Sequence, residues 1–199
     1  MLKIETIWHH LLWSALQRGE FRHTQKSLSD KYGYSLSTVN LAVKSLARIG
    51  GIKMSGKFFT VSDVKKLLYF WATHRNLSKD IIYKTWVNEP VLEIEGLIPD
   101  GAIFACYTSA KEILKESPSD YSKVYFYFDE GNLETVKRRF PPTKSPDANL
   151  FVLKEVPWQK DYGPLTTLPN TFVDLWNLSD WYAKDFLMAL ERKIDDILP

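Results

Sequence analysis

Glycines divide the first 75 residues into short periodic segments, and this division restricts the elements that the segments can form. Apolar residues recur every three or four positions in three of them, which predicts three helices: Ile4–Leu16, Gln25–Tyr32 and a segment from Ser35 to Ile49. A glycine follows each one: Gly19, Gly33 and Gly50. Glycine adopts the left-handed conformation that ends many helices, so each helix is expected to stop there. Thr24 is expected to cap the second helix, and Ser35 or Ser37 the third.

The residues after the third helix predict a small hairpin. Ile52–Met54 and Lys57–Val61 are rich in apolar and β-branched residues, and Ser55-Gly56 lies between them as a turn. Ser62 is expected to cap a fourth helix, from Asp63 to about Arg75. The predicted order is therefore helix, helix, turn, helix, hairpin, helix.

The charge of the chain is unevenly distributed. Residues 1–75 hold 12 Lys and Arg against 4 Asp and Glu, a net charge of +8, whereas residues 76–199 hold 14 against 20, a net charge of −6. We therefore expect a basic domain, 1–75, that meets a polyanion, and a mildly acidic domain, 76–199, with another task.

The third helix and the hairpin resemble a known DNA-binding domain. The segment from Ser37 to Ile52 is similar to the recognition helix of winged helix-turn-helix domains running into their wing. A helix fits the major groove, and its outward side chains meet the base edges. The side chains expected to face outward are Ser35, Ser37, Thr38, Asn40, Leu41 and Lys44. Asn40 is suited to an adenine edge and Lys44 to guanine or phosphate. The expected backbone contacts are Gln25, Lys26, Lys53 and Lys57.

The second half predicts a mixed α/β domain that ends in a long helix. Strands are expected at 81–87, 123–128 and 150–153, and helices at 90–97, 102–115, 132–139, 171–178 and 180–198. The predicted fold is thus a two-domain α+β or α/β protein, in which an N-terminal winged helix-turn-helix precedes this domain.

Recognisable chemistry is scarce in the sequence. The single cysteine, Cys106, excludes an intramolecular disulfide and favours a reducing, cytoplasmic setting, and it is expected to be a core residue. His9 and His10 are adjacent, so they cannot form the i, i+4 pair typical of helical zinc sites. No glycine-rich phosphate loop occurs, no histidine follows residue 74, and no apolar run is long enough to span a membrane. We therefore expect no catalytic residue, no metal, no cofactor and no membrane partner.

One enzyme class remains as an alternative. Metal-dependent nucleases gather carboxylates around a divalent ion, and Asp100, Asp120 and Asp129 are the candidates for such a site. Pro99-Asp100 matches the first half of the restriction-nuclease motif, but the strand carrying Glu/Asp-x-Lys is missing. The alternative is a restriction-nuclease-like DNA-processing enzyme with a winged-helix targeting domain.

Three further stretches resemble the AbiEi-like antitoxin family, the transcriptional regulators of type IV toxin-antitoxin systems: Leu97–Ala110, Pro118–Tyr127 and Thr171–Phe186. The resemblance implies a repressor whose winged helix binds the promoter of its own operon in double-stranded DNA. It also implies a neighbouring gene for a nucleotidyltransferase-like toxin, and direct contact with that toxin stays open.

Two other expectations concern partners. A winged helix alone reads few base pairs, so a homodimer or repeated operator copies are expected. A third functional hypothesis is a protein-docking adaptor that uses the aromatic C-terminal helix, in which Trp181 and Phe186 share one side.

Overall fold

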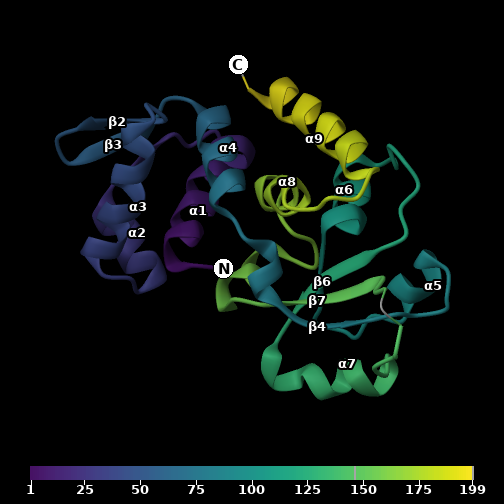
Figure 1. Cartoon of the computed structure of the whole chain (residues 1–199). Helices are drawn as coiled ribbons and strands as arrows, with labels where there is room; N and C mark the ends of the chain where they lie inside the picture. Colours follow the sequence, from purple (N-terminus) through teal and green to yellow (C-terminus); the bar gives the residue numbers. More distant parts are fainter. Residues whose placement is uncertain (146, 199) are drawn as a thin grey trace. The chain divides into compact units, whose positions relative to one another are not determined.

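The computed structural model describes residues 1–145 and 147–198 and is an α+β protein with helices and two small sheets (Figure 1). The chain forms two compact units. The first unit contains Met1–Arg75 and the end of the chain from Ile194, and the second contains Asn76–Lys193. The division before Asn76 coincides with the expected boundary, but the residues from Ile194 group with the first unit. One reason is the ion pair between Asp195 and Lys65, in which Oδ1 and Nζ are 2.7 Å apart.

The first unit contains the expected helices and hairpin. Its elements are α1 (Lys3–Arg18), β1 (Arg22–His23), α2 (Gln25–Tyr32), α3 (Leu36–Arg48), β2 (Ile52–Ser55), β3 (Phe58–Val61) and α4 (Val64–His74). The predicted caps of α2 and α3 are confirmed. Thr24 Oγ1 accepts a hydrogen bond from Ser27 N, and Ser35 Oγ accepts one from Thr38 N.

Two details of this unit differ from the prediction. Asp63, not Ser62, caps α4: its Oδ1 accepts from Lys66 N at 2.9 Å, while the Ser62 hydroxyl donates to the Gly50 carbonyl. In addition, β1 joins the hairpin and makes a three-stranded antiparallel sheet of order β1-β3-β2. A two-residue strand has no periodicity of its own, and pairing with β3 is what makes it a strand.

The core of the first unit fixes where α3 and the hairpin lie. α3 buries one side, formed by Val39, Ala42, Val43 and Leu46. The indole Nε1 of the buried Trp8 on α1 donates to the Ala42 carbonyl at 3.1 Å, which holds α3 against α1. The hairpin begins close to α4, because a Cβ at Gly51 would lie 2.3 Å from Leu67 Cδ1. A side chain at that position would therefore force the buried Leu67 side chain to move.

The second unit is built on a four-stranded sheet of order β4-β7-β6-β5. Its elements are η1 (Leu77–Asp80), β4 (Ile81–Thr85), α5 (Val91–Gly96), β5 (Ile103–Ala105), α6 (Cys106–Leu114), β6 (Val124–Phe128), η2 (Glu130–Asn132), α7 (Leu133–Arg139), β7 (Leu150–Lys154), η3 (Pro157–Tyr162), α8 (Leu168–Trp176) and α9 (Ala183–Ile197). Among the described strands β6 and β7 run parallel and the other two pairs are antiparallel. This mixed sheet makes the unit α+β rather than α/β.

Helices cover both faces of this sheet, as Figure 1 shows for α7 on one side and α6 and α8 on the other. Alternate residues of β6 point to opposite faces. Phe126 packs with Ile94 of α5 and Val136 of α7 in one cluster, whereas the Tyr127 hydroxyl donates to Asp174 of α8. All five residues of β6 are therefore buried.

The predicted helix over 102–115 is wrong at its start. Ile103–Ala105 forms β5 and pairs with Tyr125–Tyr127, and the helix begins only at Cys106. The small residues of this segment suggest a helix, but the available edge of β6 offers its backbone groups partners, and that tertiary pairing prevails. The last two helices also differ in their first residues: α8 begins at Leu168 and α9 at Ala183.

Candidate nucleic-acid interface

The exposed side of α3 is the centre of the predicted interface. Opposite the buried side lies a stripe at helical spacing, formed by Ser37, Leu41, Lys44 and Arg48, all exposed. Asn40, at the edge of this stripe, is half-buried. In the described part of the chain neither Lys44 nor Arg48 forms an ion pair, so both charges are available to an anionic partner.

The hydroxyls at the start of α3 bind one another. Ser35 Oγ lies 2.8 Å from Ser37 Oγ and 2.9 Å from Thr38 Oγ1. Ser35 and Ser37 are exposed as predicted, but Thr38 is half-buried. This network orders the N-terminus of α3. It also leaves Asn40, Leu41 and Lys44 as the side chains best placed to distinguish one partner from another.

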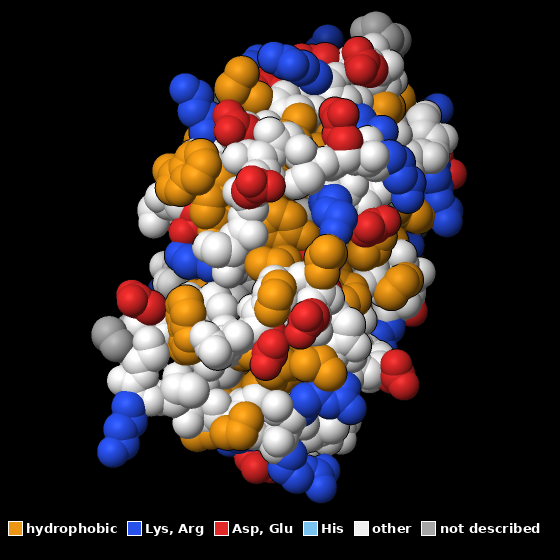
Figure 2. Space-filling view, turned by 90° about the vertical axis from the view of Figure 1, so that its right-hand side faces the viewer, with side chains coloured by type: hydrophobic (Ala, Val, Ile, Leu, Met, Phe, Trp, Pro, Cys, Tyr) orange, Lys and Arg blue, Asp and Glu red, His pale blue; other side chains and the backbone are white. Residues whose placement is uncertain are grey.

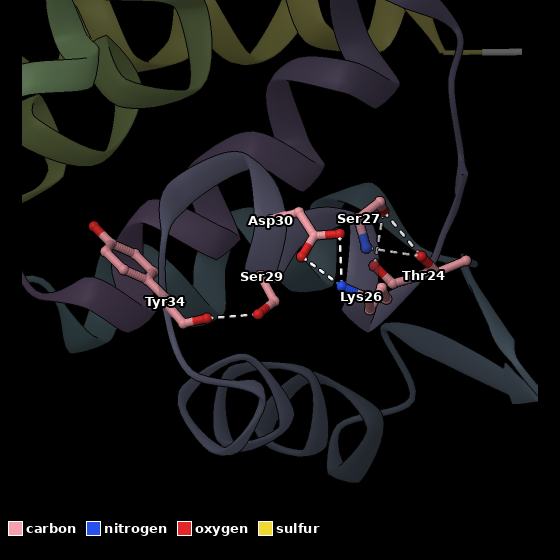
Figure 3. A network of polar contacts seen from close by, with 6 residues as sticks. All are labelled: Thr24, Lys26, Ser27, Ser29, Asp30 and Tyr34. Atoms are coloured by element: carbon pink, nitrogen blue, oxygen red, sulfur yellow. Dashed lines mark hydrogen bonds and ion pairs between the residues drawn. The ribbon is translucent and has the colours of Figure 1, made fainter.

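The predicted contacts on α2 are partly engaged within the helix itself (Figure 3). Gln25 is half-buried, and Lys26 is exposed. Lys26 Nζ lies 2.7 Å from Asp30 Oδ1, one helical turn away. In this i, i+4 pair the Asp30 carboxylate offsets the positive charge that Lys26 would present to a DNA phosphate. The i, i+4 spacing of the two residues can be read from the sequence.

The hairpin carries one exposed cation on β2 and another in the turn before β3. Lys53 and Lys57 are exposed, and neither makes an ion pair among the described residues. Sequence reasoning missed a third cation, Arg22 on β1. Its guanidinium lies 3.8 Å from the centre of the Phe58 ring, which restricts where the charge can point. Arg22 belongs to this surface because β1 pairs with β3, a pairing that no local pattern in the sequence predicts.

A groove joins α2 to the hairpin. Its volume is about 390 Å³, and it is lined by Thr24, Gln25, Lys26, Met54, Gly56, Lys57, Phe58 and Phe59. The structure thus brings Gln25, Lys26 and Lys57 to one place, over an apolar floor. The residues of the α3 stripe and Lys53 are not among those that line this groove.

Three buried histidines, His9, His10 and His23, lie in the core of the first unit, and His10 contacts α2. The Nδ1 of the buried His10 lies 3.0 Å from the Tyr32 hydroxyl and 3.4 Å from Lys31 Nζ, so it connects α1 to α2. Burial, with Lys31 nearby, lowers the pKa of His10 to about 3. Burial also lowers the pKa of His9 and of His23. The three histidines are therefore neutral at pH 7 and have a structural role here.

The candidate nuclease residues do not form a site. Asp129 caps η2 and accepts from Asn132 Nδ2 at 2.8 Å, and Asp120 is exposed in a loop. Asp100 lines a polar pocket of about 490 Å³ with Asn132 and Arg139. Within residues 1–145 and 147–198, no three His, Cys, Asp or Glu side chains are placed to hold a metal ion. The described residues thus do not support the alternative in which Asp100, Asp120 and Asp129 gather around a metal ion.

Cys106 and the C-terminal helix contribute to the core. Cys106 is buried at the junction of β5 and α6, as expected for a core residue.

α9 buries Phe186, whereas Trp181 precedes the helix and is 77% exposed. The two aromatic residues therefore do not form the shared exposed face that a docking helix needs. On the face drawn in Figure 2, hydrophobic side chains are interspersed with charged ones.

The described helices are all too short or too polar to cross a lipid bilayer. Neither a protein-family profile, nor a curated protein, nor a solved structure matches this chain. What the surface around α3 does is therefore inferred from its own residues and their geometry.

Proposed function

We propose that this protein is a DNA-binding transcriptional regulator whose first unit is a winged helix-turn-helix domain. In this proposal α3 enters the major groove of double-stranded DNA, and the β2–β3 hairpin is the wing. The observation that carries the proposal is the α3 stripe, on which Lys44 and Arg48 are exposed without ion pairs in the described part of the chain. The net charge of +8 over residues 1–75 supports an anionic partner.

The resemblance of the second unit to AbiEi-like antitoxins extends this proposal to a biological role. The regulator would repress a toxin-antitoxin operon that contains its own gene, and the neighbouring gene would encode a nucleotidyltransferase-like toxin. The DNA directly upstream of its own start codon is then the operator, and it is the probe for the experiments below.

Asn40 and Lys44 are expected to contribute to operator binding. Asn40→Ala should lower affinity for the upstream duplex by about 5- to 150-fold, since a good side-chain pair with a base is worth roughly 1–3 kcal/mol. Lys44→Ala should lower affinity as well. Gel shifts at fixed salt measure both effects, and Lys84→Ala, an exposed lysine of the second unit, is the matched control. Unchanged binding by both α3 variants would refute the proposal.

Asp30 is expected to restrain DNA binding through Lys26. Asp30→Asn removes the partner of Lys26, so the freed cation should raise affinity and steepen the plot of log K against log salt by about 0.9. Lys57→Ala should make the same plot shallower by about 0.9. Fluorescence anisotropy from low to high salt measures the slopes, with Asp120→Asn as the exposed control. A slope that Asp30→Asn leaves unchanged would exclude Lys26 as a backbone contact.

A further inference from the structure

An exposed leucine lies within the polar stripe of α3. Leu41 is 59% exposed, and its neighbours on the helix surface are Ser37, one turn before, and Lys44 and Ser45, one turn after. The Ser45 hydroxyl donates to the Leu41 carbonyl at 2.9 Å, so this neighbour is tied to the backbone. The buried side of α3 faces away from Leu41, and packing within the unit therefore gives no reason for a large apolar side chain here.

The groups around Leu41 define what its partner must offer. Lys44 and Arg48 present unpaired charges within the described chain, which favours an anionic partner. The Ser37 hydroxyl is already hydrogen-bonded to Ser35. The partner must therefore carry negative charge and present an apolar group at the level of Leu41.

The major groove of DNA offers one such group. The edges of guanine, cytosine and adenine present hydrogen-bond donors and acceptors there, whereas thymine adds the C5 methyl. Phosphates on either side of the groove would meet Lys44 and Arg48. An apolar side chain between cations on a major-groove helix thus matches a thymine methyl flanked by phosphates.

We infer that Leu41 is a specificity-determining residue that contacts thymine C5 methyl groups in the operator. This inference rests on the proposed function and adds which base α3 prefers. Asn40 lies beside Leu41 and is suited to the adenine edge, so the two residues together favour A·T pairs in the bases that α3 covers.

The test compares two versions of one duplex, the DNA directly upstream of the start codon. One contains thymine, and the other contains deoxyuracil at every thymine position, which removes the methyl groups and keeps base pairing. The full-length wild-type protein should bind the uracil duplex about fourfold more weakly for each methyl that Leu41 contacts. Leu41→Ala should bind both duplexes equally, and Leu41→Met should restore a preference for thymine.

Leu36→Ala is the matched control. Leu36 is 51% exposed on the same helix, but it lies five residues before Leu41 and off the stripe, so this variant should keep the wild-type thymine preference. An equal thymine preference in the wild type and in Leu41→Ala would overturn the inference and leave the proposed function standing. Failure of the wild type to bind either duplex would instead refute the proposed function. Thermal unfolding at the wild-type temperature confirms that each variant is folded.

Discussion

Replacing Glu5 by alanine is expected to lower the free energy of unfolding by about 3–5 kcal/mol, because it removes one partner of a buried ion pair. Glu5 Oε1 lies 3.8 Å from Arg75 Nη1 and accepts a hydrogen bond from the Trp71 indole at 3.2 Å. Both charged side chains are at most 4% exposed. The variant leaves the Arg75 charge, on a side chain that is 2% exposed, without the Glu5 carboxylate. Urea unfolding at pH 7 measures the loss.

An exposed ion pair and a double variant provide the controls. Asp30→Ala breaks the Lys26–Asp30 pair, whose side chains are 75% and 61% exposed, and should cost less than about 1 kcal/mol. Glu5→Leu combined with Arg75→Met removes both charges and should recover part of the stability that Glu5→Ala loses. Similar losses in Glu5→Ala and Asp30→Ala would show that burial does not strengthen the pair.

Mild acid is expected to unfold the first unit. Burial lowers the pKa of His9, His10 and His23, so the folded state takes up protons less readily than the unfolded state. Stability is therefore complete above the ordinary histidine pKa of about 6.5 and falls as the pH drops below it. The loss continues toward the native pKa, which for His10 is about 3. Each histidine contributes up to about 1.4 kcal/mol per pH unit.

The combined slope is large compared with the stability of a domain. Three such histidines give up to roughly 4 kcal/mol per pH unit, and a domain is typically stable by about 5–15 kcal/mol. Urea unfolding at pH values from 7 to 5 measures the slope. His10→Gln should reduce it by up to about 1.4 kcal/mol per pH unit, because one titrating group is lost. A slope that is the same in His10→Gln would exclude His10 as a source of the acid sensitivity.

The sequence predicts the elements of the first unit well because their signals are local. Helical periodicity, N-caps and terminal glycines each act within a few residues. Thr24 and Ser35 cap α2 and α3, and Gly19 ends α1, as predicted. The strongly β-prone run Val124–Phe128 is likewise found as β6. The ion pair of Lys26 with Asp30 is also local, and the i, i+4 rule would have identified it.

The sequence alone determined the helices and hairpin of the first unit, its basic charge and the exposure of Ser35, Ser37, Leu41 and Lys44 at α3. Tertiary structure decided that Arg22 joins the hairpin, that Ile103–Ala105 is a strand, and that Asp100, Asp120 and Asp129 stay apart. It also decided that Glu5, His9, His10 and His23 are buried. Strand pairing, burial and electrostatic environment depend on residues far apart in the chain. Periodicity and capping depend on residues that are close together in the chain. A single sequence shows such local relations directly.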